Sequence, residues 1–158
     1  LKDTHILFTK ANAEPEASTI NSAIDEFVAA HPERMVAYPS LGQFRYLSTM
    51  QYVDAVLGNS SSGIIEAPSF RIATVNIGCR QEGRIKADSV IDCQPTASSI
   101  KGAISRVYQD EFRRVLRTVT NPYGHGLAAE KILKVIRTHP IDALIRKTFF
   151  DLPRRANL

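Results

Sequence analysis

The residues best suited to chemistry are three consecutive serines, Ser60, Ser61 and Ser62, which lie between two glycines in the segment 58–63. At the start of a helix the first amides have no partner within the helix, and the helix dipole adds partial positive charge, so anions bind there. The hydroxyls add donors, and the glycines permit close approach of a ligand. The segment therefore predicts a phosphate-binding loop, with a simple N-cap role for Asn59 or Ser60 as the alternative.

A carboxylate and several cations stand at useful spacings from this loop. Glu66 follows Ser61 by five residues, which is about 7 to 8 Å along a helix. The diphosphate and the ribose of one nucleotide are separated by a similar distance, and a carboxylate accepts hydrogen bonds from two ribose hydroxyls. After the next strand-like run the chain supplies Arg80, Arg84 and Lys86, which would balance diphosphate charge. The combination predicts a nucleotide site.

Other motifs of phosphate and nucleophile chemistry are missing from the sequence. A GxxxxGK[ST] loop needs lysine where Ile64 stands, no serine has the GxSxG surroundings of a nucleophile elbow, and GxGxxG is absent. The four histidines are scattered, and Cys79 and Cys93 lack the spacing of metal ligands. We therefore expect no metal, no cofactor and unpaired thiols, which suit a reducing compartment.

These residues need a scaffold, and the chain alternates short β-rich runs with helical periodicity. Strands are predicted at residues 5–9, 35–38, 54–58, 73–77 and 89–92. Helices are predicted at residues 20–28, 43–50, 64–70, 100–108, 128–136 and 141–149, with Thr96 or Ser98 as the N-cap of the fourth. Strands that are apolar on both faces favour one parallel sheet covered on both sides, which is a Rossmann-like α/β domain. Ligands bind at the carboxyl ends of such strands, where the serine loop lies.

Composition bounds the remaining possibilities. The 158 residues are 44% hydrophobic, which is enough for one domain with a sizeable core. No long apolar run and no signal-peptide pattern occur, so we expect a cytoplasmic protein without a membrane partner. The chain starts at Leu1 within a strand-like run, which suggests a piece of a longer protein. Residues 80–158 carry fifteen basic and eight acidic side chains, a balance that fits a polyanionic partner but fits solvent-facing helix surfaces better.

Three ordered segments carry a resemblance to a known family. They are residues 56–67 (VLGNSSSGIIEA), residues 74–84 (TVNIGCRQEGR) and residues 121–130 (NPYGHGLAAE). Together they resemble the hydrolysing UDP-N-acetylglucosamine 2-epimerases, in the branch that serves sialic-acid and related nonulosonate synthesis. The third segment departs from the family pattern NPYGDG-x-A-A-E at His125, which replaces an aspartate. Residues 10–14 match the family's PNAD-like turn only loosely.

The resemblance implies the C-terminal half of a GT-B-type enzyme made of two Rossmann-like domains. We expect this nucleotide-binding domain to span residues 1–150, followed by a polar tail at 151–158. In the family this domain grips UDP, which implies Ser60 and Ser61 at the diphosphate, Glu66 at the ribose hydroxyls and Arg80 close to the nucleotide. Residues near the uracil would be Tyr38, Leu41 and Phe44. The expected nucleotide-binding set is Ser60, Ser61, Ser62, Gly63, Glu66, Arg80, Leu41 and Phe44.

The family reaction removes the C2 proton of UDP-N-acetylglucosamine, eliminates UDP and adds water at C1, which releases N-acetylmannosamine. Its catalytic carboxylates come largely from the N-terminal domain. The resemblance therefore implies no catalytic residue in this chain, which should bind UDP weakly and catalyse nothing by itself. The expected partners are a UDP-sugar substrate, the missing N-terminal domain and further copies of the protein in a dimer or tetramer.

Three alternatives stay open. The substrate is another UDP- or GDP-linked acetamido sugar, such as a diacetamido-trideoxy sugar, or the chain is the nucleotide-sugar-binding half of a GT-B glycosyltransferase. The least favoured alternative is a non-catalytic module that binds nucleic acid through the basic second half. The chain lacks a nucleic-acid motif and aromatic–basic interleaving, so we expect no nucleic-acid partner.

Overall fold

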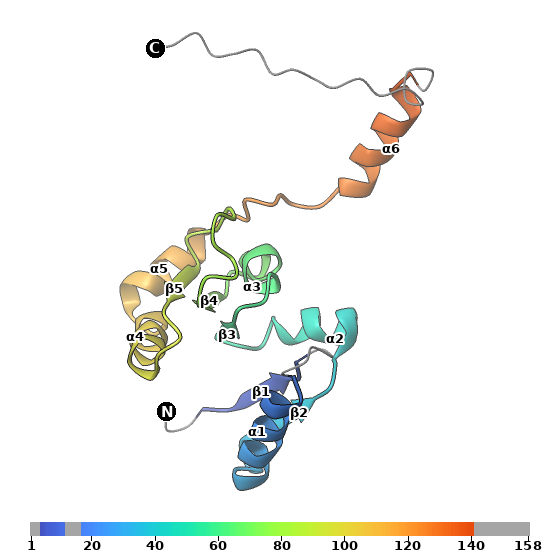
Figure 1. The fold of residues 1–158 in the computed structure, drawn as a ribbon. Coiled ribbons are helices and arrows are strands. Elements are labelled where there is room, and N and C mark those ends of the chain that lie inside the picture. The colour runs from blue at the N-terminus through green and yellow to red at the C-terminus, as the bar shows by residue number, and fades with distance from the viewer. Residues whose placement is uncertain (1–3, 12–16, 141–158) are drawn as a thin grey trace, which may run out of the picture. The chain divides into compact units, whose positions relative to one another are not determined.

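A computed structural model describes residues 4–11 and 17–140 (Figure 1). The chain divides into two compact units, Leu1–Tyr123 and Gly124–Leu158. The described part of the second unit contains one helix, α6 (Ala128–Thr138). The helix expected at 141–149 and the tail at 151–158 lie outside the described residues, so the expected domain bounds remain a prediction.

The strands of the first unit all pair in parallel. They are β1 (Ile6–Thr9), β2 (Met35–Tyr38), β3 (Ala55–Gly58), β4 (Ala73–Ile77) and β5 (Val90–Cys93). Their positions and the parallel α/β class agree with the prediction, but their grouping differs: β1 pairs with β2, and β4 pairs with both β3 and β5, which makes two sheets. The prediction of one sheet assumed that every strand is buried on both faces. Only β4 comes close to this, whereas β1, β2 and β3 each keep exposed side chains.

Helices follow most strands. The first unit contains α1 (Ala17–Ala30), α2 (Gly42–Thr49), α3 (Ser62–Ile65), the 3-10 helix η1 (Ala67–Phe70), α4 (Ala97–Val107) and α5 (Asp110–Thr118). The predicted helix at 64–70 is wrong in its regularity, because Pro68 has no amide to donate and the α-helical pattern ends at Ile65. The helix α5 is an addition to the predicted elements. Its signal is present, since Phe112, Val115 and Leu116 have helical spacing between charged residues.

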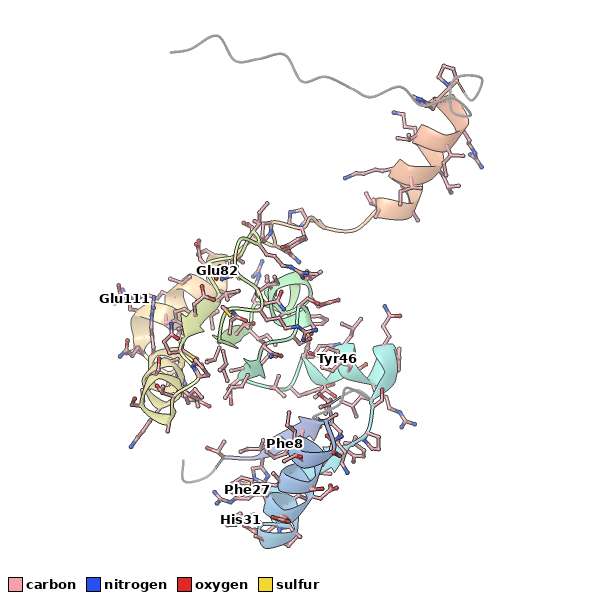
Figure 2. All side chains as sticks on the ribbon, in the orientation of Figure 1. Phe8, Phe27, His31, Tyr46, Glu82 and Glu111 are labelled. Carbon is pink, nitrogen blue, oxygen red and sulfur yellow. The ribbon has the colours of Figure 1, made fainter. Side chains whose placement is uncertain are left out.

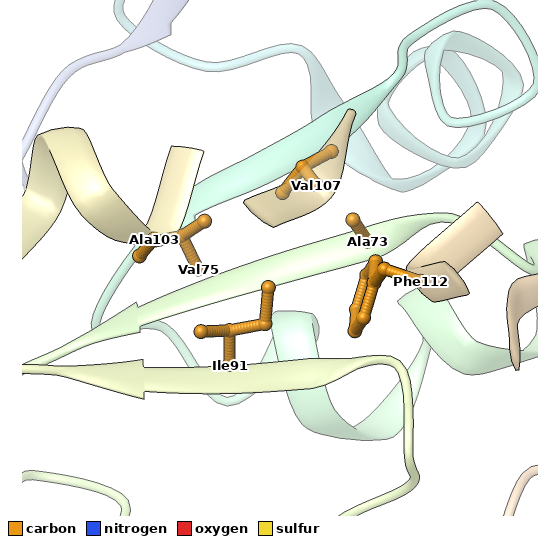
Figure 3. Close-up of a cluster of buried hydrophobic side chains, with 6 residues drawn as sticks. All are labelled: Ala73, Val75, Ile91, Ala103, Val107 and Phe112. Atoms are coloured by element: carbon orange, nitrogen blue, oxygen red, sulfur yellow. The ribbon is translucent and has the colours of Figure 1, made fainter. Parts of the chain in front are cut away.

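The three-stranded sheet is packed on both faces. One face carries a cluster of Ala73, Val75 and Ile91 from the strands, Ala103 and Val107 from α4, and Phe112 from α5 (Figure 3). Neighbouring residues of a strand point to opposite faces, so Thr74 points away from this cluster and donates its hydroxyl to the Gly63 carbonyl of α3 at 2.7 Å. A second cluster joins Met50, Ala67 and Ile72, with Val56 of β3 packed against it. The prediction of helices on both faces is therefore confirmed for this sheet, and α3 is seated on β4.

Aromatic contacts seat α1 on the two-stranded sheet. The ring centroids of Phe8 in β1 and Phe27 in α1 lie 6.5 Å apart, and those of Phe27 and His31 lie 5.2 Å apart, both edge to face (Figure 2). Elsewhere, the predicted N-cap of α4 is confirmed as Thr96, whose hydroxyl accepts the Ser99 amide at 3.3 Å. Among the helices of the described residues, none is long and apolar enough to cross a membrane.

Candidate nucleotide site

The serine loop leaves β3 at Gly58, whose φ of 143° favours glycine. The N-cap of α3 is Ser61, which makes no side-chain cap bond. Of the two alternative caps, Asn59 makes no cap bond, and its side chain faces the next loop. Ser60 lies one residue before the N-cap, and its hydroxyl accepts the amide of Ser62, the first residue of the helix. Because α3 has only four residues, the helix dipole adds little here, and an anion would depend on nearby amides and hydroxyls.

The three serines differ in what they still offer to a ligand. The Ser60 hydroxyl accepts the Ser62 amide at 3.4 Å, and the Ser62 hydroxyl is hydrogen-bonded to the phenol of Tyr46 in α2. Within the described part of the chain, the amides of Ser60 and Ser61 and the hydroxyl of Ser61 have no hydrogen-bond partner. The loop thus presents donors at its start, upstream of the helix proper.

Gly63 has a packing role in this structure. A Cβ atom at this position would stand 2.6 Å from Cγ2 of Thr74, which is far closer than two carbon atoms tolerate. The Gly63 amide also donates to the Ser60 carbonyl at 3.2 Å. Glycine is required here so that α3 can approach β4, and a contact of Gly63 with a nucleotide remains a prediction.

Glu66 follows α3 as its C-cap residue and keeps helical backbone angles. Its side chain is partly buried, and one carboxylate oxygen, Oε2, is buried without a hydrogen-bond partner. An unsatisfied buried acceptor costs about 1–3 kcal/mol, more when it is charged. The Glu66 carboxylate therefore has unused capacity to accept hydrogen bonds.

The loop between β4 and β5 meets the serine loop at Asn59. Arg80 donates from Nη1 to the Asn59 Oδ1 at 3.5 Å, and Gln81, only 2% exposed, donates from Nε2 to the Asn59 carbonyl at 2.6 Å. Lys86 instead binds both carboxylate oxygens of Asp92, at 2.9 and 2.8 Å. Because Lys86 is paired with Asp92 in this structure, its role as a counter-ion for a diphosphate remains a prediction. Arg80 is the predicted cation that the structure places beside the serine loop.

The partner of Lys86 is itself perturbed. Burial raises the pKa of Asp92, but hydrogen bonds from Lys86 and from Asn76, together with the Lys86 charge, outweigh it and lower the pKa. Asn76 Nδ2 donates to Asp92 Oδ1 at 2.6 Å. This cluster ties the end of the β4–β5 loop to both strands.

A cavity of about 390 Å³ lies beside β1, β2 and α2. Its lining residues are Leu7, Tyr38, Leu41, Phe44, Arg45, Ser48, Thr49 and Tyr52. The structure thus brings together the three residues predicted to contact a base, Tyr38, Leu41 and Phe44. Phe44 is 85% exposed, so its ring is open to stacking. Through Tyr46 and its bond to Ser62, α2 also contacts the serine loop.

The segment after α5 supplies contacts that sequence reasoning missed. Asn121, 9% exposed, donates from Nδ2 to the Ile65 carbonyl and to the Ser69 hydroxyl, both at 2.7 Å. Its Oδ1 accepts the Tyr123 amide at 2.9 Å, and the Tyr123 hydroxyl donates to the Ile85 carbonyl at 2.9 Å. The Asn-Pro dipeptide signals a turn, but no local pattern identifies partners more than 50 residues away.

The described residues offer no metal centre of ordinary composition. Within residues 4–11 and 17–140, no three His, Cys, Asp or Glu side chains gather as metal ligands would. Cys79 and Cys93 are free thiols in this structure.

The architecture is that of one Rossmann-like half of a GT-B-type enzyme. A crystal structure of a Listeria monocytogenes protein assigned as a UDP-N-acetylglucosamine 2-epimerase matches the chain with a TM-score of 0.65. The match covers 88% of this chain and 37% of that one, at 20% identity. At this identity the likeness concerns the fold.

The family follows from the sequence comparison. The profile of the UDP-N-acetylglucosamine 2-epimerase family matches residues 1–137, and the chain belongs to this family. It is 34% identical over 153 residues to the GDP/UDP-N,N'-diacetylbacillosamine 2-epimerase (hydrolyzing) of Campylobacter jejuni. It is also 32% identical over 155 residues to polysialic acid biosynthesis protein P7 of Escherichia coli. Each alignment covers 96% of this chain but 39% of the relative, so the chain spans about two fifths of the length of these relatives.

Proposed function

We propose that this chain is the nucleotide-binding part of a hydrolysing 2-epimerase that acts on a nucleotide-linked acetamido sugar. The observation that carries the proposal is the complementarity of the site to a nucleoside diphosphate. The unpaired amides of Ser60 and Ser61, the unpaired Ser61 hydroxyl and the Arg80 guanidinium suit a diphosphate, while the Glu66 carboxylate, whose Oε2 has no hydrogen-bond partner, suits ribose hydroxyls. An uncharged ligand would have no use for the cluster of amides and the guanidinium, whereas a nucleoside diphosphate uses these donors as well as the carboxylate.

The base would occupy the cavity beside α2. Flat bases stack on aromatic rings, and Tyr38, Phe44 and Tyr52 all line this cavity. Leu41 adds apolar surface to its lining. The bond between Tyr46 and Ser62 then joins the base subsite to the diphosphate subsite.

In the whole enzyme the proposed reaction is removal of the C2 proton of the sugar, elimination of the nucleoside diphosphate and addition of water at C1. Proton removal needs a positioned base, and the carboxylate at this site, Glu66, is assigned to the ribose. The acid and base groups are therefore proposed to lie in the part of the enzyme that corresponds to the remaining length of its relatives. This chain alone should bind nucleotide without turnover.

The candidate sugars of the whole enzyme are those for which its relatives are named. The Campylobacter jejuni relative is named for GDP- or UDP-linked N,N'-diacetylbacillosamine, so this diacetamido sugar is the first candidate, and UDP-N-acetylglucosamine, after which the family is named, is the second. Release of free sugar by the whole enzyme from each donor in turn discriminates them.

Calorimetric titration of the chain with UDP, GDP and ADP tests the proposal. We expect selective UDP binding that weakens about tenfold or more in the Ser60→Ala/Ser61→Ala variant. This variant keeps the backbone amides but removes two hydroxyl donors, and hydrogen bonds to charged groups are worth about 1.5–3 kcal/mol. Ser105→Ala is the control, because that hydroxyl bonds within α4. Arg80→Gln should weaken binding more than Arg84→Gln, which removes the same charge from the same loop. Binding of GDP alone would reassign the nucleotide, and failure of all three to bind would refute the proposal.

A further inference from the structure

The geometry points to Asn121 as a positioning residue that sets Glu66 in place for the ribose, an inference that rests on the proposed function. Asn121 touches neither Glu66 nor a ligand. It binds the backbone directly before Glu66 and a side chain three residues after it.

The reason lies in how α3 ends. In a continuous α-helix the Ile65 carbonyl would accept the amide of Ser69, four residues later. Here the Ser69 amide donates to the Glu66 carbonyl at 3.0 Å instead, which is the 3-10 pattern of η1. Pro68 likewise has no amide to donate to the carbonyl of Ile64, four residues earlier. The change of helix type at Glu66 therefore leaves the Ile65 carbonyl without a partner from its own helix.

Asn121 supplies that partner. Its Nδ2 group carries two hydrogens, and they go to the Ile65 carbonyl and the Ser69 hydroxyl, both at 2.7 Å. Its Oδ1 is occupied by the Tyr123 amide, so the side chain is held in one orientation at both ends. The same amide group therefore holds the backbone before Glu66 and the Ser69 side chain after it.

This arrangement matters for a ligand because the Glu66 side chain, whose Oε2 has no hydrogen-bond partner, is not held in place by a polar contact of its own. A carboxylate with no hydrogen bond of its own keeps its position only if its backbone is held. Recognition of ribose hydroxyls by the Glu66 carboxylate therefore depends on the backbone that Asn121 holds.

The test compares UDP with 2'-deoxy-UDP by calorimetry on the same protein sample. The ratio of the two dissociation constants reports ribose recognition and does not depend on the fraction of folded protein. The starting protein should favour UDP on the order of tenfold, and Glu66→Ala should bring the ratio close to one. We expect Asn121→Asp, which keeps the shape but turns both donors into acceptors, to lower the ratio as Glu66→Ala does.

Asn121→Ala is the second variant if the aspartate prevents folding, and Tyr123→Phe, which removes only the bond to Ile85, is the control that should keep the ratio. A purely structural role would weaken both ligands equally and leave the ratio unchanged, which would overturn the inference while UDP binding stands. Absence of UDP binding by the unaltered chain would instead remove the proposed function itself.

Discussion

Replacing Gly63 by alanine should destabilise the chain, although alanine is the better helix former. The new Cβ would stand 2.6 Å from Cγ2 of Thr74 and 3.5 Å from its Oγ1. Carbon atoms in contact prefer about 3.5–4.0 Å, so α3 or β4 has to give way. Thr74 is 2% exposed, and its hydroxyl is bonded to the Gly63 carbonyl, so rotating this side chain away would break that bond.

The size of the loss follows from two opposing effects. Overpacking a buried contact costs about 1–3 kcal/mol. Alanine recovers at most about 1 kcal/mol of helix propensity, and less at Gly63, which lies at the second position of a four-residue helix. The free energy of unfolding should therefore fall by about 1–2 kcal/mol.

Urea unfolding followed by circular dichroism provides the assay, in a double-mutant cycle with Thr74→Ser. Serine removes the Cγ2 methyl that would clash but keeps the hydroxyl, so the Gly63→Ala/Thr74→Ser double variant should be more stable than the sum of the single changes predicts, by about 1 kcal/mol. Gly102→Ala is the matched control. It lies inside α4, where a Cβ meets no atom within 4 Å, and it should stabilise by about 0.5–1 kcal/mol. Unchanged stability of Gly63→Ala, or no relief from Thr74→Ser, would refute this reasoning.

Three further changes test the supports of the site and the core. Asp92→Asn should lower the free energy of unfolding at pH 7 and make it less sensitive to acid. Burial raises the pKa of Asp92, but the hydrogen bonds from Lys86 and Asn76 and the Lys86 charge outweigh it and lower the pKa, so the stabilisation is present above the ordinary value of 3.8 and is lost as pH falls through the lower folded value. Identical pH dependence of urea unfolding in both proteins would contradict this. Gln81→Leu removes the donor to the Asn59 carbonyl and should cost about 1–3 kcal/mol and weaken UDP binding, whereas exposed Gln51→Leu should change stability by less than about 0.5 kcal/mol. Thr96→Ala should cost about 0.5–2 kcal/mol in thermal unfolding through the lost cap of α4, and a smaller loss than in Ser98→Ala would argue against the cap.

The sequence predicts those parts of the fold that depend on local patterns. The strands β2 and β4 have the predicted bounds, because each is a short apolar run closed by a turn residue or a polar one. The partner of the Ile65 carbonyl at the end of α3 is not predicted, because it is Asn121, which is distant in the sequence. For the same reason charge spacing identifies Lys86 as a cation but does not reveal that Asp92 already pairs with it.

The candidate site is held by supports from three separate elements, and this bears on how binding and stability are linked. Thr74 of β4 donates to the Gly63 carbonyl and so holds α3 against the sheet. Gln81 of the β4–β5 loop holds the Asn59 carbonyl, and Asn121 holds the Ile65 carbonyl next to Glu66. None of these side chains is more than 9% exposed, so they act on a ligand only through the backbone that they hold. Loss of Thr74 or Gln81 should therefore lower stability and UDP affinity together, because both move the serine loop. Loss of Asn121 should change ribose recognition selectively, because it moves only the carboxylate.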